Sequence, residues 1–136
     1  MNSTYQQIQF KLERAEQLLL EIFPHTEDPR IFLSILSLLQ NITEELIQII
    51  QQHTLTPQNT NNNYQSTLLN QLKTIQSHIQ NLLSTHHSCP TEINTKDHII
   101  MYTNEFQQKT TINKNDIQNI IIQIKQIIQN VNNQQK

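Results

Sequence analysis

The fold expected for this chain follows from the segment IFLSILSLLQNITEELIQII, residues 31–50. Its apolar residues recur at alternating steps of three and four. This spacing places them on one side of an α-helix. Additional apolar residues beside this stripe widen the apolar face, so we expect the helix to contact more than one neighbour. The stripe consists of Phe32, Ile35, Leu39, Ile42, Leu46 and Ile49, and the residues that widen it are Leu36, Leu38 and Ile50.

Three further segments show the same spacing and are also predicted to be helices. The first is expected to end before Pro24, because proline disfavours the helical conformation in the residue that precedes it. The predicted helices cover about residues 4–23, 29–52, 65–85 and 114–133. The stripes are Tyr5, Ile8, Leu12, Ala15, Leu19 and Ile22 in the first helix, Leu68, Leu72, Ile75, Ile79 and Leu82 in the third, and Ile117, Ile121, Ile124, Ile128 and Val131 in the fourth.

Polar residues mark two of the helix starts. Asp28 can accept hydrogen bonds from the free amides in the first turn of the second helix. Asn113, followed three residues later by Asp116, can begin the fourth helix in the same way. The chain is therefore predicted to be a single, mainly α domain over residues 1–136, a four-helix bundle-like fold with a flexible linker at residues 53–64.

The segment HHSCPTEINTKDHIIMY, residues 86–102, interrupts the helical pattern. We predict extended or β structure over residues 91–111, either as a short β-hairpin or as one strand across the end of the helices. Asn104 and Glu105 are the expected turn. The apolar residues of this segment would then cover the core, and they are Ile93, Ile99, Met101 and Phe106.

Composition and charge narrow the classes of function. Residues 1–52 hold seven acidic and three basic residues, and the remainder holds four acidic residues and six lysines, for a net charge of −2 over 136 residues. Neither part has the dense basic surface that nucleic-acid binding requires, and without glycine the usual phosphate-binding loop cannot form. With one cysteine and no run of about 18 apolar residues, the chain is predicted to be cytoplasmic, with no membrane span.

The interrupting segment also contains side chains with the chemistry of a metal or catalytic site. His78, His86, His87, Cys89 and His98 are potential ligands, but a second pair of closely spaced ligands, as zinc sites need, is missing. Cys89 with His87 lacks an orienting carboxylate, so a nucleophilic dyad is not expected. We therefore predict no catalytic, cofactor-binding or metal residues. Metal binding through His86, His87 and Cys89 is kept as an alternative.

Four glutamates on the predicted helices raise the question of a paired-carboxylate site. Di-iron sites in helical bundles require Glu-x-x-His motifs on core faces, and the sequence contains no such motif. We therefore expect these residues on solvated faces; they are Glu13, Glu16, Glu44 and Glu45.

Two segments carry a resemblance to a known family: AEQLLLEIFPHTEDPRIFL, residues 15–33, and CPTEINTKDHIIMY, residues 89–102. The chain resembles a family of small, largely helical, uncharacterised archaeal proteins. Their pattern has an aromatic-Pro pair, an Asp-Pro-Lys/Arg step, and later Ser-Pro-x-Glu and Lys-Asp. This chain has Cys89 where the pattern has serine, and Thr95 where it often has arginine. The resemblance implies the same order of elements and lends no function. It is carried by Ala15, Glu16, Phe23, Pro24, Asp28, Pro29, Arg30, Pro90, Glu92, Ile93, Lys96, Asp97, Phe106, Lys109 and Thr110.

The charged residues of the second segment, Glu92, Lys96 and Asp97, are interpreted as braces for the helices, with a surface patch for a partner as the alternative. For the whole chain we predict a non-enzymatic protein-interaction or structural module. Its expected partner is a second copy in a homodimer or an unknown protein, because several helices carry more apolar residues than one stripe needs.

A function from another class is also considered, because small helical bundles with an acidic first hairpin resemble HEPN domains associated with RNA or toxin–antitoxin systems. The ribonucleases among them carry an arginine closely followed by a histidine on one helix. Here His25 lies eleven residues after Arg14 and beyond Pro24, and no histidine closely follows Arg30. The alternative is therefore an inactive HEPN-like domain.

Overall fold

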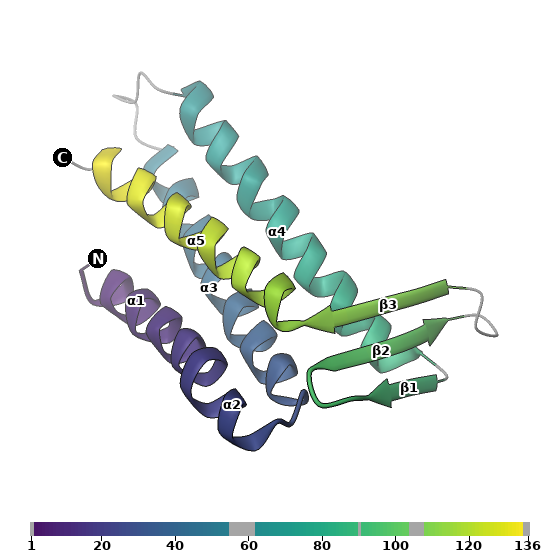
Figure 1. The fold of residues 1–136 in the computed structure, drawn as a ribbon. Coiled ribbons are helices and arrows are strands. Elements are labelled where there is room, and N and C mark those ends of the chain that lie inside the picture. Colours follow the sequence, from purple (N-terminus) through teal and green to yellow (C-terminus); the bar gives the residue numbers. More distant parts are fainter. Residues whose placement is uncertain (1, 55–61, 90, 104–107, 135–136) are drawn as a thin grey trace.

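The structure is a computed structural model that describes residues 2–54, 62–89, 91–103 and 108–134. It is mainly helical, as predicted, with four helices and a small antiparallel sheet between the third and the fourth (Figure 1). The first helix consists of α1 (Asn2–Gln17), a π-helical turn η1 (Leu18–Ile22) and α2 (Phe23–Thr26). The remaining elements are α3 (Ile31–Thr54), α4 (Asn62–Ser88), β1 (Thr91–Asn94), β2 (His98–Thr103), β3 (Gln108–Asn113) and α5 (Lys114–Gln134).

Helix α3 lies at the centre of the packing, because it contacts α1, α4 and α5. The wide apolar face predicted for this helix explains the three neighbours. A fully buried aliphatic side chain contributes about 1.5–3 kcal/mol, so this helix supplies a large part of the hydrophobic stabilisation. Its buried apolar residues are Phe32, Ile35, Leu36, Leu39, Ile42, Leu46 and Ile50.

The same helix has the length and composition of a membrane span. Among the described residues, Ile31–Gln52 is the one stretch that meets both conditions. Its buried residues belong to the hydrophobic core that all four helices share. A core helix of this kind meets the same conditions without entering a membrane.

The first helix does not end before Pro24, and that prediction is wrong. Phe23 keeps helical angles, and its N–H donates to the carbonyl of Leu18, five residues back. This wider turn opens the ladder of i→i+4 hydrogen bonds just where proline brings no N–H donor, so the helix continues to Thr26. The turn also changes which residue faces the core: Phe23 is buried, whereas Ile22, predicted in the stripe, is 38% exposed.

The link between the first two helices contains a residue in a left-handed conformation. Glu27 has φ 49° and ψ 33°, and its N–H donates to the carbonyl of Phe23 at 2.8 Å. Such a cap usually falls on glycine, which this chain lacks. Asp28 Oδ1 accepts a hydrogen bond from the backbone N–H of Arg30 at 3.0 Å, as expected of this residue, and helix α3 begins at Ile31, slightly later than the predicted residue 29.

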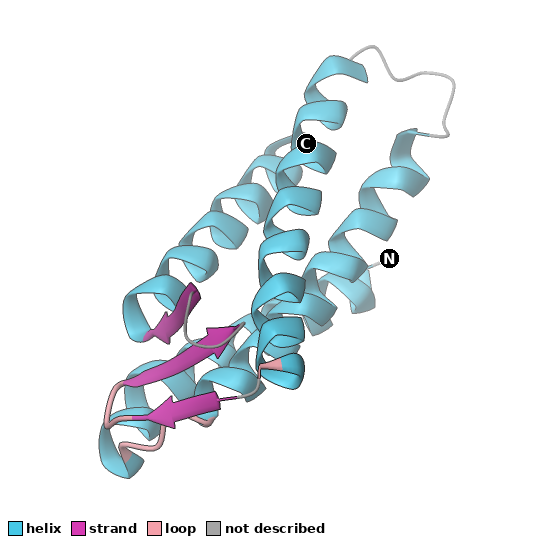
Figure 2. Ribbon diagram, turned by 90° about the vertical axis from the view of Figure 1, so that its right-hand side faces the viewer, coloured by secondary structure: helices cyan, strands magenta, loops and turns pink. Residues whose placement is uncertain are grey.

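The sheet has three strands in the order β1-β2-β3, one more than the predicted hairpin. Figure 2 shows it at the end of the helices where α4 ends and α5 begins. Ile99 and Met101 are buried as predicted, and Ile112 of β3 joins them. Ile93 was expected to cover the core but is 46% exposed. The expected contributions of Phe106 and of the turn at Asn104 and Glu105 lie outside the described residues.

Helix α5 starts directly after β3. Asn113 Oδ1 accepts a hydrogen bond from the backbone N–H of Asp116 at 2.9 Å, which confirms the predicted helix start. The other end of the helix contacts α1, because the hydroxyl of Tyr5 donates to the carbonyl of Ile128 at 3.2 Å. Burial raises the pKa of the Tyr5 hydroxyl, since the phenolate would lose its hydration there.

Candidate functional site

The side chains with the richest chemistry lie where α4 meets β1. His86 and His87 occupy the last turn of α4, and positive charge is favoured at that end of a helix. His86 Nδ1 is hydrogen-bonded to Glu92 Oε1, which connects α4 to β1. The thiol of Cys89 donates to the carbonyl of His86 at 3.5 Å. The junction is therefore stabilised by the pair of His86 and Glu92, which the sequence alone did not predict.

The donor atoms at this junction do not converge. Within the part of the chain that the structure describes, no group of three or more His, Cys, Asp or Glu side chains could hold a metal ion. Each of the three residues of the metal-binding alternative points elsewhere: His86 toward Glu92, Cys89 toward a carbonyl, and His87 into an exposed position. The rings of His86 and His87 lie 5.6 Å apart at 55°.

A second histidine–carboxylate pair lies in the turn between β1 and β2. His98 Nδ1 is 2.6 Å from Asp97 Oδ1, and this hydrogen bond holds the pKa of Asp97 below its ordinary value. The hydroxyl of Thr95 also donates to Asp97, at 3.3 Å. The backbone N–H of Thr95 donates to the carbonyl of His98 at 3.0 Å, which closes the turn without glycine.

Two charged residues of the sheet segment pair with residues in a helix or directly after one, as the bracing interpretation predicts. Glu92 pairs with His86 of α4, and Lys96 Nζ lies 3.9 Å from Glu27 Oε2 at the end of the first helix. Asp97 instead pairs within its own turn. The Lys96–Glu27 contact is exposed and long, and exposed ion pairs contribute little stability.

Two of the four glutamates face neighbouring helices, contrary to the expectation of solvated faces. Glu45 Oε1 lies 2.5 Å from Lys11 Nζ, which connects α3 to α1. Its other oxygen is buried and has no hydrogen-bond partner among the described residues. Glu16 Oε1 lies 2.7 Å from Lys125 Nζ and connects α1 to α5. These ion pairs fix the first helix on its neighbours, and sequence spacing alone gives no sign of them.

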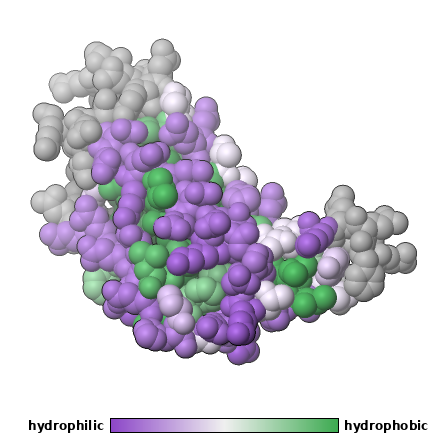
Figure 3. All heavy atoms as spheres, viewed as in Figure 1, coloured by the Kyte–Doolittle hydropathy of each residue, from purple (hydrophilic) through white to green (hydrophobic). Residues whose placement is uncertain are grey.

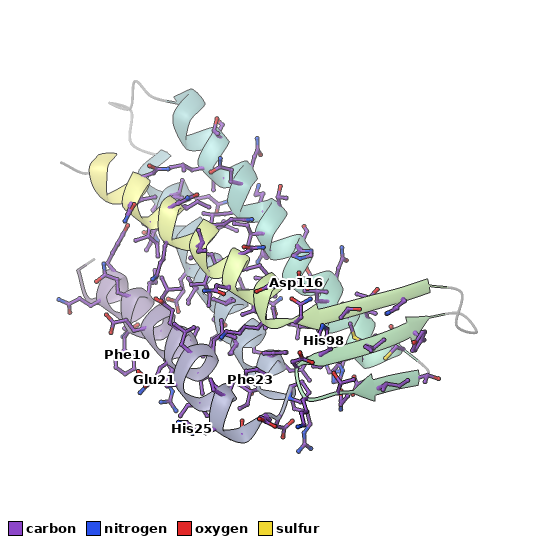
Figure 4. All side chains as sticks on the ribbon, viewed as in Figure 1. Phe10, Glu21, Phe23, His25, His98 and Asp116 are labelled. Carbon is purple, nitrogen blue, oxygen red and sulfur yellow. The ribbon has the colours of Figure 1, made fainter. Side chains whose placement is uncertain are left out.

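The arginines and the histidine considered for an RNA-cleaving site do not form a common site, and each arginine has a partner nearby in the sequence. Arg14 Nη1 lies 3.5 Å from Gln17 Oε1 on the same helix. The guanidinium of Arg30 forms hydrogen bonds with both carboxylate oxygens of Asp28, at 2.8–3.1 Å. These bonds lower the pKa of Asp28 and raise that of Arg30. His25 is exposed on α2 and points away from the core (Figure 4).

Several large apolar side chains are exposed instead of buried. Among the described residues there are five, and three of them belong to the first helix: Phe10 is 70% exposed, Leu20 47% and Ile22 38%. The other two are Ile93 of β1 and Ile122 of α5, each 46% exposed. Figure 3 shows apolar atoms on the visible side of the projecting sheet and also over the helices, among polar surface.

A shallow groove of about 480 Å³ runs between α4 and α5. Its base includes Ile75 and Ile127, and its other lining residues are uncharged amides and hydroxyls. Such a lining offers hydrogen bonds without charge and therefore selects no particular class of ligand. The remaining lining residues are Thr67, Asn70, Gln71, Thr74, Gln123, Gln126 and Asn130.

Comparisons with known proteins add no relative. No family model matches the chain, and neither the curated proteins nor the solved structures contain a match. The resemblance to the archaeal proteins therefore stays a prediction, and a function must be proposed from the surface described above.

Proposed function

We propose that this protein is a non-enzymatic interaction module that binds another protein through the outer side of its first helix. The observation that carries the proposal is the 70% exposure of Phe10, an aromatic residue that contributes little to the core from this position. Aromatic side chains are enriched in protein–protein interfaces, where a few such anchors supply most of the binding energy. Leu20 and Ile22 add apolar surface further along the same helix.

Exposed charges of both signs lie on the same helix. Glu13, Arg14 and Glu21 are exposed, and Figure 4 shows Phe10, Glu21 and His25 on the outer side of the helix, with Phe23 directed inward. A partner with an apolar side chain flanked by charges of both signs would complement this surface. Complementary charges accelerate association and select among partners.

The first helix is held by its neighbours and presents this surface in a defined position. The Lys11–Glu45 ion pair fixes it to α3, and the Tyr5 hydroxyl bonds to the backbone of α5. A preorganised surface loses less conformational entropy on binding. In this proposal the four helices serve as a bundle-like scaffold in the cytoplasm, and the sheet is not needed for this contact.

The test compares Phe10→Ser with the matched control Ile122→Ser, which removes an exposed apolar side chain from α5. Proteins that the wild-type chain captures from its source cells are purified, and their affinities are measured by calorimetry. We expect Phe10→Ser to weaken binding about tenfold or more, with Ile122→Ser close to wild type. Equal affinities of all three chains would refute the proposal, provided that circular dichroism shows each variant folded.

A further inference from the structure

We propose that two copies of this chain pair through the free edge of β1 and form one continuous sheet across a twofold axis at Ile93. This self-association uses a different surface from the first helix, so it stands or falls independently of the proposed function. β1 is the outer strand in the order β1-β2-β3, and Glu92, Ile93 and Asn94 are all exposed. Within the described residues its other edge has no strand partner.

The hydrogen-bond pattern between β1 and β2 shows which backbone N–H and C=O groups point to the free edge of β1. The N–H of Thr95 donates to the carbonyl of His98, so these two residues form a hydrogen-bonded pair. Hydrogen-bonded and non-hydrogen-bonded pairs alternate along antiparallel strands. Ile93, opposite Ile100, therefore bonds toward β2, whereas Glu92 and Asn94 direct their N–H and C=O groups to the free edge.

This edge is complementary to itself. With the axis at Ile93, Glu92 of one copy lies opposite Asn94 of the second copy, and the reverse pair follows by symmetry. Each of these pairs can exchange two backbone hydrogen bonds. The two Glu92 carboxylates are not placed opposite each other, and each is already bonded to His86 of its own chain. Like charges directly opposite would oppose pairing, and this register avoids them.

Side chains on the outer face of the sheet support the same register. Ile99 and Met101 face the core, so Ile100 between them faces outward, and Ile93 opposite it shares that face. Pairing about Ile93 would place the isoleucines of the two copies in one stripe, with an Ile93 and an Ile100 from each. The 46% exposure of Ile93 would then be explained by burial in the dimer.

The ends of the paired strands carry charges of both signs. The same register places the β1–β2 turn of one copy beside the start of β1 in the other. Lys96 and Asp97 in this turn are both exposed and carry opposite charges, so the turn adds no net charge to this contact. The feature that favours a second copy over an unrelated extended peptide is therefore the isoleucine stripe, to which each copy contributes Ile93 and Ile100.

The edge has some of the features by which native proteins limit strand pairing, because it is short, carries the charge of Glu92, and is flanked in the sequence by Pro90 and Lys96. The strand Thr91–Asn94 itself contains neither lysine nor proline. Because it has only four residues, the interface is small, and small interfaces are typically weak and reversible. We expect a dimer that forms at high protein concentration.

The experiment is sedimentation equilibrium of the full chain from about 10 μM to about 1 mM, with Ile93→Thr and the control Ile122→Thr. Both residues are 46% exposed, and threonine keeps the β-branched shape. We expect a monomer–dimer equilibrium whose dissociation constant rises about tenfold in Ile93→Thr and is unchanged in Ile122→Thr and in Phe10→Ser. Asn94→Pro, which removes a donor from the free edge, should abolish the dimer.

Hydrogen exchange gives a second readout that does not depend on any variant. The amides of Glu92 and Asn94 should be protected at high protein concentration and exchange freely on dilution. A wild-type chain that stays monomeric up to about 1 mM would overturn the proposal. So would a dimer in which these amides stay unprotected, or one that Ile122→Thr weakens as much as Ile93→Thr. If the amides of Glu92 and Asn94 become protected only when another protein is added, the partner of the β1 edge is not a second copy of this chain, and the proposal is refuted.

Discussion

The helices and the sheet are stabilised in different ways. Helix α3 alone buries seven apolar side chains, whereas the whole sheet buries three, Ile99, Met101 and Ile112. The first strand buries none and is connected to the helices through polar contacts, Glu92 with His86 and, from the adjoining turn, Lys96 with Glu27. Regions with few buried apolar contacts open at lower free energy than the core. The sheet should therefore be the more adaptable part, which suits a surface that pairs reversibly.

The largest effect is expected in the helical core. Replacing Leu39, a fully buried residue of α3, with alanine should lower the free energy of unfolding by about 3 kcal/mol, because it leaves a cavity between packed helices. Urea denaturation measures the loss. Ser37→Ala on the exposed side of the same helix is the control and should change it by less than about 0.5 kcal/mol. Similar losses in the two variants would show that α3 is not the centre of stability.

A smaller and more local effect is expected for Ile99→Ala in β2. We expect a loss of about 2 kcal/mol, accompanied by faster amide exchange in β2 and β3 while α3 keeps its protection. The reason is that the sheet has few buried side chains and can open without the helices. Ile93→Ala, on the exposed side of β1, is the control. Equal loss of protection in α3 and the sheet would show that the two regions unfold as one unit.

The connection between the two regions can be weakened at the start of α5. Asn113→Ala removes the acceptor for the N–H of Asp116 and should cost about 1 kcal/mol, the usual contribution of such a cap. Asn113→Ser, which can restore the acceptor, should recover most of the loss in thermal denaturation. Asn115→Ala tests the neighbouring exposed asparagine. If it destabilises the protein as much as Asn113→Ala, the effect does not come from the cap.

The smallest effect concerns the link before α3, where Arg30 lowers the pKa of Asp28. A carboxyl group whose pKa is lower in the folded state stabilises the fold above its unfolded pKa, about 3.9, and loses this effect as the pH falls through its folded pKa. Asp28→Asn should therefore slightly lower the melting temperature at neutral pH, and the difference should vanish in acid. Glu44→Gln, at an exposed position, is the control. A difference between wild type and Asp28→Asn that persists unchanged in strong acid would contradict the role of the charge.

The helices could be predicted because their signal is local. The stripe in residues 31–50 and the starts at Asp28 and Asn113 depend on spacing and on hydrogen bonds within one turn. The continuation through Pro24 could not be predicted in this way, because a π-helical turn leaves no periodic mark in the sequence. The strand beyond the predicted hairpin is β1 (Thr91–Asn94), because the expected turn at Asn104 and Glu105 already assigned the hairpin to the segments of β2 and β3.

The contacts of the candidate sites could be predicted less well than the helices, because they depend on the tertiary structure. The sequence shows that histidines, a cysteine and several carboxylates lie between residues 78 and 98, but not that His86 pairs with Glu92. Nor does it show that Glu16 and Glu45 pair with lysines on other helices. These partners come from different elements, and their distances follow from how the helices pack.

The helical class and most of the core residues thus follow from the order of apolar and polar residues, since that pattern specifies one buried side for each helix. Phe10 lies outside the stripe predicted for the first helix, so local spacing already placed it away from the core. The exposure of Ile93 follows instead from packing, because this apolar residue was expected in the core and no described element covers its side of the sheet. Whether a side chain is covered depends on residues far away in the chain, and local spacing contains no information about them.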